Sequence, residues 1–105
     1  MAWVYLVLAG IFEIVWASFM KQSEGFSRLV PSVITIVTMI ISFALLALAM
    51  RSLPLGTAYA IWTGIGAVGA FLVGVFVLGE AATLFRVASV SLILAGIVGL
   101  KLSTT

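Results

Sequence analysis

The chain has 105 residues, of which 65% are hydrophobic and only 8% are charged, with a formal net charge of +2. A soluble domain carries roughly 25% charged residues, so this composition excludes a soluble protein and indicates an all-α, polytopic membrane protein. The small charge is no nucleic-acid-binding footprint, and the absence of Cys and His removes thiol chemistry, Cys-based metal sites and the commonest proton shuttle.

The first apolar stretch predicts a membrane-spanning helix over residues 2–20, with Glu13 near its middle. Nineteen helical residues rise about 28 Å, close to the roughly 30 Å hydrocarbon core of a bilayer. A carboxylate at that depth costs on the order of 3 kcal/mol or more and is a functional residue by default. Since desolvation disfavours the charged form, Glu13 can hold either a proton or a cation. We expect this competition to be the function of the chain.

Small residues share the helix face of Glu13, because Gly10 and Ala17 lie three and four residues away from it. They leave room for a ligand or for another backbone. Trp16 lies one turn further on, where its ring face can contact a bound cation. The alternative interpretation is that Trp16 only packs in the span.

A second helix is predicted over residues 31–50, because a proline such as Pro31 is well tolerated in the first turn of a helix. This span has no charge, and its Ser and Thr side chains mostly bond back to a carbonyl one turn earlier. Ser42 lies deepest among them. We expect Ser42 to make a polar contact with Glu13.

A third helix is predicted over residues 57–79, and it carries an aromatic stripe at helical spacing. The stripe consists of Tyr59, Trp62, Thr63 and Gly66. Packing is the plainer interpretation, but the phenol and the indole N–H also need partners in a dry site. Gly64 and Gly66 weaken the helix in mid-span, which predicts a hinge that opens one end of a cavity while closing the other.

A fourth helix is predicted over residues 84–102, after Glu80, which we interpret as a solvated end residue near Arg86. Its charge-free run over residues 87–100 spans about 21 Å and crosses the bilayer if the flanking Arg and Lys side chains snorkel. The small residues Ser89 and Gly96 lie seven positions apart on one face. This spacing favours close helix–helix contact, so we predict the dimer contact there.

The loop charges of these four spans are nearly balanced. Arg51 and Lys101 lie on the side of the termini, against Lys21, Arg28 and Arg86 on the other side, so the bias that sets orientation is almost absent. Transporters usually contain inverted repeats, and this chain has no internal repeat. Two copies inserted in opposite directions would supply that repeat, and their two Glu13 carboxylates would form a pair across one central cavity, for which protons and the cation compete. We therefore favour an antiparallel homodimer over a parallel dimer whose orientation is set by folding.

Several of these residues also form the motifs of a known family. The matching features are Gly10, Glu13, the loop over residues 21–28, the Pro31-Ser32 start and the run PLGTAYAIWTGIG over residues 54–66. Over nearly its whole length the chain resembles the small multidrug resistance transporters. Within that family the chain resembles the guanidinium-exporter branch, on the basis of Trp16, Thr57, Thr63 and residues 99–101.

The resemblance implies an antiparallel, dual-topology homodimer of the inner membrane that exchanges protons for guanidinium, not an enzyme. Residues 1–105 would form one four-helix transmembrane domain, with protons as the coupling ion and no other cofactor or metal. Glu13 would bind substrate or protons. The residues that would line the site are Gly10, Trp16, Ser42, Tyr59 and Trp62, and we count Thr63 with them.

Three other functions fit parts of the same pattern. The first is an exporter of hydrophobic quaternary ammonium compounds, which a buried acid with aromatic neighbours fits equally well. The second is a proton-carrying rotor subunit, which also buries one carboxyl group in a Gly-rich helix. The third is a non-transporting partner or assembly subunit in which Glu13 pairs structurally with another protein. The aromatic residues near Glu13 and the balanced loop charge argue against the second function.

Overall fold

The computed structural model describes residues 1–103, which form four α-helices. They are α1 (Ala2–Gln22), α2 (Leu29–Ala49), α3 (Leu55–Phe76) and α4 (Leu84–Ser103). All four are long and apolar enough to cross a membrane, as the sequence predicts. Residues 104 and 105 of the predicted domain 1–105 lie outside the described residues.

The helix ends differ from the predicted ones by up to three residues. Helix α2 begins two residues before Pro31, which lies in the first turn, where its missing N–H removes no helical hydrogen bond. Helix α3 begins directly after Pro54, whose carbonyl accepts a hydrogen bond from the Ala58 N–H at 3.0 Å. It ends before the predicted Gly79, because Gly79 adopts a φ of 73° and turns the chain back.

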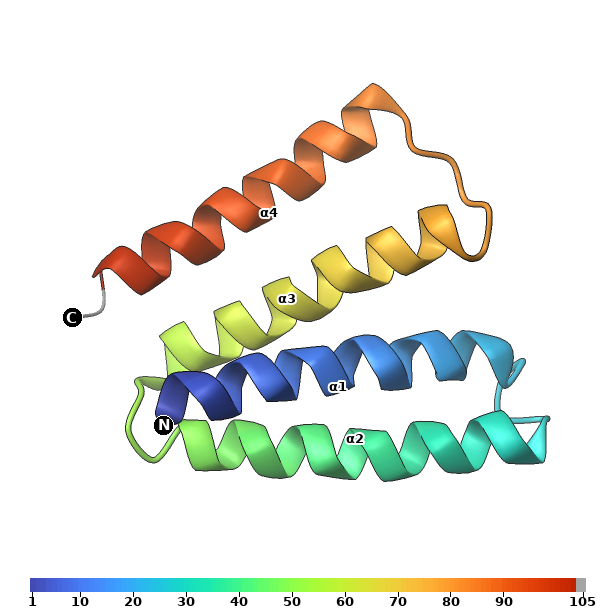
Figure 1. The fold of residues 1–105 in the computed structure, drawn as a ribbon, viewed down its shortest axis with the longest axis horizontal. Helices are drawn as coiled ribbons and strands as arrows, with labels where there is room; N and C mark the ends of the chain where they lie inside the picture. The colour runs from blue at the N-terminus through green and yellow to red at the C-terminus, as the bar shows by residue number, and fades with distance from the viewer. Residues whose placement is uncertain (104–105) are drawn as a thin grey trace.

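The helices lie side by side in the order α2, α1, α3, α4 (Figure 1). Helix α1 packs against both α2 and α3, and α4 packs against α3. The molecule measures 42 × 34 × 16 Å. Since a helix with its side chains is about 10–12 Å across, the chain forms little more than a single layer. Such a layer has two broad faces, and most apolar side chains on them are exposed.

The core occupies the end of the layer that holds the N-terminus. Its buried apolar residues come from the first half of α1, the second half of α2 and the first half of α3. They are Leu6, Ala9, Leu46, Ala49, Ala58, Ile61 and Trp62. Because the core stops there, the second half of α1, which follows Glu13, is only half-buried.

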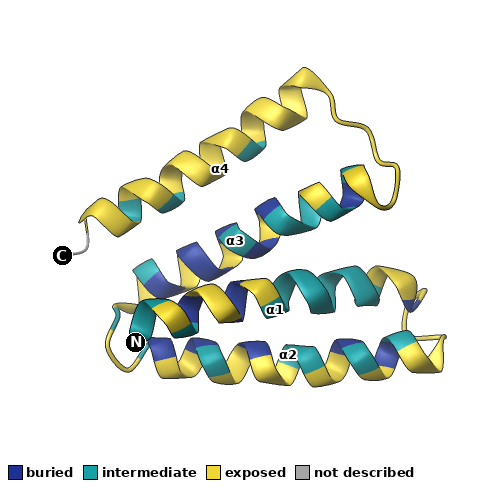
Figure 2. Ribbon diagram, in the orientation of Figure 1, coloured by how far each residue is buried: buried dark blue, intermediate teal, exposed yellow. Residues whose placement is uncertain are grey.

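Helix α4 lies at the edge of the layer and contains no buried residue (Figure 2). Its contact with α3 includes the Ile97 side chain, which lies against Gly64. Near its C-terminal end, the Lys101 ammonium lies 4.4 Å above the centre of the Trp3 ring of α1. The packing of α4 on the rest of the chain is therefore light.

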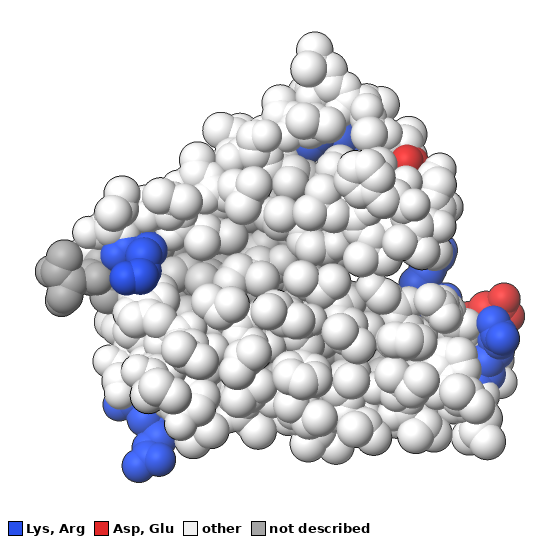
Figure 3. All heavy atoms as spheres, viewed as in Figure 1, with Lys and Arg blue, Asp and Glu red and all other residues white. Residues whose placement is uncertain are grey.

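Charged side chains lie at the margins of the face seen in Figure 3, and its middle is uncharged. The last turns of α1 and α4 carry Lys21 and Lys101. A protein that spans a bilayer needs this distribution, because a charge in the hydrocarbon core is costly.

Candidate functional site

Glu13 lies where α1 crosses α3, and its carboxyl group rests on the backbone of Gly66. A Cβ atom added at Gly66 would lie 2.7 Å from Cγ of Glu13 and closer still to its Cδ and Oε1 atoms. Only glycine at this position leaves room for the carboxyl group. Gly66 therefore lies opposite Glu13 for a steric reason, because any side chain at this position would overlap the Glu13 carboxyl group.

Two further glycines bring α1 and α3 into close contact around Glu13. A Cβ at Gly10 would lie 2.6 Å from Cγ2 of Ile65, and one at Gly69 would overlap the side chain of Ile14. Small residues at a membrane-helix interface allow such an approach, because the backbones then pack directly on neighbouring side chains. Gly10 is packed against the Ile65 side chain, one turn before Glu13, and its role in lining the site stays a prediction.

Two polar atoms at this crossing are buried without a hydrogen-bond partner among the described residues. They are Oε1 of Glu13 and Nε1 of Trp16. Buried polar groups in folded proteins are almost always paired, and an orphan acceptor beside an orphan donor needs an explanation. A bound cation, a proton or a group from another chain would satisfy the carboxylate oxygen.

Ser42 does not make the predicted polar contact with Glu13. Its hydroxyl donates to the backbone carbonyl of Ala9 at 2.7 Å and accepts the indole N–H of Trp62 at 3.0 Å. The single hydrogen of the Ser42 hydroxyl is therefore donated to the Ala9 carbonyl of α1, and Ser42 has no second hydrogen to donate to the Glu13 carboxylate. The prediction was wrong because the depth of a residue in its span does not fix which neighbouring atom it faces. The bridge joins α1, α2 and α3.

The aromatic side chains form a connected row across α1, α2 and α3. The centre of the Phe43 ring lies 6.4 Å from that of Trp16 and 5.6 Å from that of Trp62, both in edge-on geometry. The Tyr59 and Trp62 rings follow at 5.6 Å. Sequence reasoning missed Phe43, although it is the one aromatic residue in an otherwise aliphatic helix and directly follows Ser42.

The predicted stripe of α3 divides between two environments. Trp62 and Gly66 are buried, whereas Tyr59 is 53% exposed and Thr63 is also exposed. Gly64, predicted as a hinge, lies inside one continuous helix, where a Cβ would lie 2.7 Å from Cδ1 of Ile97. Close packing on α4 is thus a sufficient reason for glycine at this position, and the hinge stays a prediction.

The predicted dimer-contact residues are both exposed in the described chain. Ser89 is exposed and its hydroxyl donates to the Phe85 carbonyl at 2.9 Å, within α4 itself. A Cβ added at Gly96 would meet no atom of the described residues within 4 Å. These residues are available to a second chain, and their role stays a prediction.

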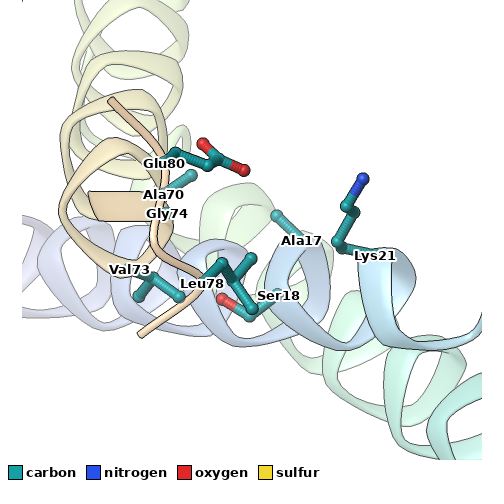
Figure 4. Close-up of a pocket in the computed structure, with 8 residues that line it drawn as sticks. All are labelled: Ala17, Ser18, Lys21, Ala70, Val73, Gly74, Leu78 and Glu80. Carbon is teal, nitrogen blue, oxygen red and sulfur yellow. The ribbon is translucent and has the colours of Figure 1, made fainter. Parts of the chain in front are cut away.

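Glu80 differs from its predicted surroundings. Arg86 donates to the Ala81 carbonyl at 3.3 Å, and the Glu80 side chain folds back over Gly74 of α3. There it lines a pocket between α1 and α3 together with Lys21, which lies across the mouth of the pocket (Figure 4).

No cluster of three or more His, Cys, Asp or Glu side chains that could hold a metal ion occurs among residues 1–103. The polar side-chain groups buried between α1, α2 and α3 include the Glu13 carboxylate, the indole N–H groups of Trp16 and Trp62 and the Ser42 hydroxyl. This set suits a small organic cation with N–H donors and a flat face.

Four apolar spans define a small multi-pass helical membrane protein, in which one carboxylate lies half-buried between two of the spans. The family model described as Small Multidrug Resistance protein matches residues 1–93, and the chain belongs to this family. The chain is 62% identical over 104 residues to a protein of Escherichia coli K12 named guanidinium exporter, with 99% of each chain covered. A protein of the same name from Yersinia pestis is 61% identical, with 99% of this chain and 100% of that protein covered. Another from Citrobacter freundii is 59% identical, with 99% of each chain covered.

The family assignment has two direct consequences. The chain is a transporter of the small multidrug resistance family rather than an enzyme, because its relatives carry the names of exporters. It is also a multi-pass protein of the inner membrane, in agreement with its four apolar helices.

Proposed function

We propose that this chain exports guanidinium, and small substituted guanidines, in exchange for protons, with both ligands competing for Glu13. The observation that carries the proposal is the buried, unpaired Oε1 of Glu13 at the α1–α3 crossing. The high identity to proteins named guanidinium exporter supports the choice of substrate.

The chemistry of guanidinium suits this site. The ion is planar and weakly hydrated, and its parallel N–H donors pair with both oxygens of a carboxylate. Its flat faces stack on aromatic rings, which the row of Trp16, Phe43, Trp62 and Tyr59 supplies. The bridge from Ser42 to Ala9 and Trp62 then acts as a scaffold that holds one ring of this row in place.

Exchange follows from the competition between the two ligands. A carboxylate in an apolar slab is stable when it carries either a proton or a cation, and the two cannot occupy one oxygen pair together. Proton entry from the acidic side therefore releases guanidinium on that side, and loss of the proton on the other side restores the site. The apparent affinity for guanidinium should fall as the pH is lowered.

The working unit in this proposal is an antiparallel homodimer. A layer 16 Å thick does not enclose a cavity by itself, so a second copy has to close the site. The exposed surface of α4, with Ser89 and Gly96, is available for that contact. The nearly equal loop charges permit both orientations. A facing copy also brings polar groups toward the unpaired atoms of Glu13 and Trp16.

The remaining predicted residues have definite tasks in this scheme. The path of guanidinium past Glu13 is lined, or its walls are supported, by Gly10, Trp16, Ser42, Tyr59, Trp62 and Thr63. Thr63 and Tyr59 project from the exposed side of α3, where they would face the second copy. A bend at Gly64 and Gly66 would alternate access between the two sides of the membrane, because both positions lack a side chain that resists a change in helix packing.

The test is guanidinium-driven proton movement in liposomes that contain only this purified chain. A guanidinium gradient should move protons in the opposite direction, reported by a pH-sensitive dye inside the liposomes. Glu13→Gln should abolish the signal. Glu24→Gln, which removes an acid from the exposed loop after α1, is the matched control and should behave as the unmodified chain.

Two results would contradict the proposal. A signal with a quaternary ammonium compound but none with guanidinium would overturn the substrate. A Glu13→Gln variant that transports normally would overturn the site, and with it the exchange mechanism.

A further inference from the structure

A second feature of the α1–α3 crossing lies toward the C-terminal ends of both helices. A pocket begins one helical turn beyond Glu13 and Gly66, about 6 Å along each axis. Its walls are small residues of α1 and α3, and a carboxylate and an ammonium group stand at its mouth (Figure 4). The lining residues are Ala17, Ser18, Lys21, Ala70, Val73, Gly74, Leu78 and Glu80.

The spacing of residues places this pocket in line with Glu13. On α1, Glu13, Ala17 and Lys21 follow one another at four-residue intervals and so lie on one face. On α3, Gly66, Ala70 and Gly74 have the same spacing. The pocket therefore lies on the face of α1 that carries Glu13 and on the face of α3 that carries Gly66, one turn further along both helices.

The backbone after α3 directs the Glu80 side chain into this pocket. Gly79 has a φ of 73°, a conformation that glycine adopts at little cost, and the chain reverses there. The Glu80 N–H then donates to the Gly74 carbonyl at 2.8 Å, which ties the residue to the last turns of α3. The carboxylate lies against Gly74, so closely that a Cβ at that position would overlap it. Glu80 is exposed, as predicted for an end residue, but its side chain is directed over Gly74.

We propose that the Glu80 carboxylate is an outer binding site for the exported guanidinium cation, at the mouth of the pocket that lies in line with Glu13. This inference rests on the proposed function. The carboxylate offers the same paired oxygens as Glu13, but in contact with water, where a cation binds weakly and leaves quickly. Such a site raises the local concentration of cations next to Glu13.

Lys21 has the opposite role in this arrangement. Its ammonium lies across the mouth of the pocket from Glu80 (Figure 4). Lys21 forms no ion pair with Glu80 among the described residues, so its charge acts by repelling guanidinium from the pocket mouth, and its flexible stem lets the ammonium move toward water. Removing the acid should therefore weaken the apparent binding of substrate, whereas removing the ammonium should strengthen it.

The experiment compares transport kinetics in proteoliposomes for two pairs of variants. Glu80→Gln should raise KM for guanidinium about two- to fivefold, the effect of losing one exposed ionic contact, with kcat within about twofold of the unmodified chain. Lys21→Gln should lower KM by a similar factor. The matched controls are Glu24→Gln and Arg28→Gln, which remove the same charges from the loop at the same end of the molecule but outside the pocket.

The outcomes separate the two proposals. If the unmodified chain moves no guanidinium, the proposed function and this inference both fail. If it does, and Glu80→Gln has the same KM as Glu24→Gln, only the outer site is overturned. Size-exclusion chromatography shows whether Glu80→Gln folds. If it does not, Lys21→Gln is the test, and a KM of Lys21→Gln equal to that of Arg28→Gln contradicts the proposal.

Discussion

The three helices α1–α3 and the fourth helix differ sharply in how they are held. Within the first three, backbones approach through Gly10 and Gly66, and a buried serine joins all three helices. Helix α4 is as apolar as the others but has no buried residue. Similar composition thus produces a packed unit in one region and an open surface in the other.

This difference separates two tasks that a small transporter has to perform. A carboxylate in the membrane needs a rigid surrounding, because small displacements change which cation it can pair with. Association with a second chain needs an apolar surface that the monomer leaves uncovered. In water such a surface would be a liability, but in a bilayer lipid covers it, and in the proposed homodimer a second copy would cover part of it.

The sharpest way to break the packed region is Gly66→Ala. The new Cβ would overlap the Glu13 carboxyl group, which would have to move out of the crossing. Transport of guanidinium should fall on the order of a hundredfold, because a shift of about 1 Å at a binding group has effects of that size. Proteoliposome transport at saturating guanidinium measures the loss.

Gly56→Ala is the matched control for this substitution. It makes the same change in the first turn of the same helix, where a Cβ meets no described atom within 4 Å. Its transport should equal that of the unmodified chain, and its stability should be unchanged or slightly higher. Equal transport by both variants would mean that Gly66 does not position Glu13.

The open region is tested by Gly96→Leu in α4. Because the position contacts no other described residue, the single chain should fold normally, whereas a partner packed there would be pushed away. Overpacking of this kind costs about 1–3 kcal/mol, so self-association should weaken roughly tenfold. The chain has no cysteine, and an introduced Ser103→Cys can carry dyes for energy transfer between copies in liposomes.

Val98→Leu is the control for α4, since it enlarges an exposed residue two positions away, on the opposite side of the helix. Its self-association should be unchanged. A Gly96→Leu variant that associates as tightly as this control would remove α4 from the proposed dimer contact.

A smaller effect is expected for Ser42→Ala, which removes the polar bridge inside the packed region. The Trp62 N–H loses its acceptor in a buried place, and the Ala9 carbonyl loses one donor. The loss should lower the free energy of unfolding in SDS by about 1–2 kcal/mol. The control is Ser91→Ala, which removes an exposed hydroxyl that bonds within its own helix. It should change the free energy of unfolding by less than about 0.5 kcal/mol.

The sequence was sufficient to predict the four apolar spans and which residues of α1 share a face with Glu13. Each of these depends on the period of a single helix and on the apolar length that a bilayer requires. Trp16 beside Glu13 and Gly10 on the same face follow from that period alone.

The contacts between helices could not be predicted in the same way. Ser42 was placed at the right depth but faces Ala9 and Trp62, because its partner depends on the rotation of α2 against α1 and α3. Phe43 and Glu80 were missed for related reasons. Phe43 joins two aromatic residues from other helices, and the position of Glu80 depends on a reversal at Gly79.

The central claim, that guanidinium and protons compete for Glu13, has a direct test in solution. Guanidinium is added to the purified chain in weakly buffered detergent, and the protons released are measured with a pH indicator. The account predicts proton release by the unmodified chain and by Glu24→Gln, and none by Glu13→Gln. Equal release by Glu13→Gln, or binding of guanidinium without any release from the unmodified chain, would contradict it.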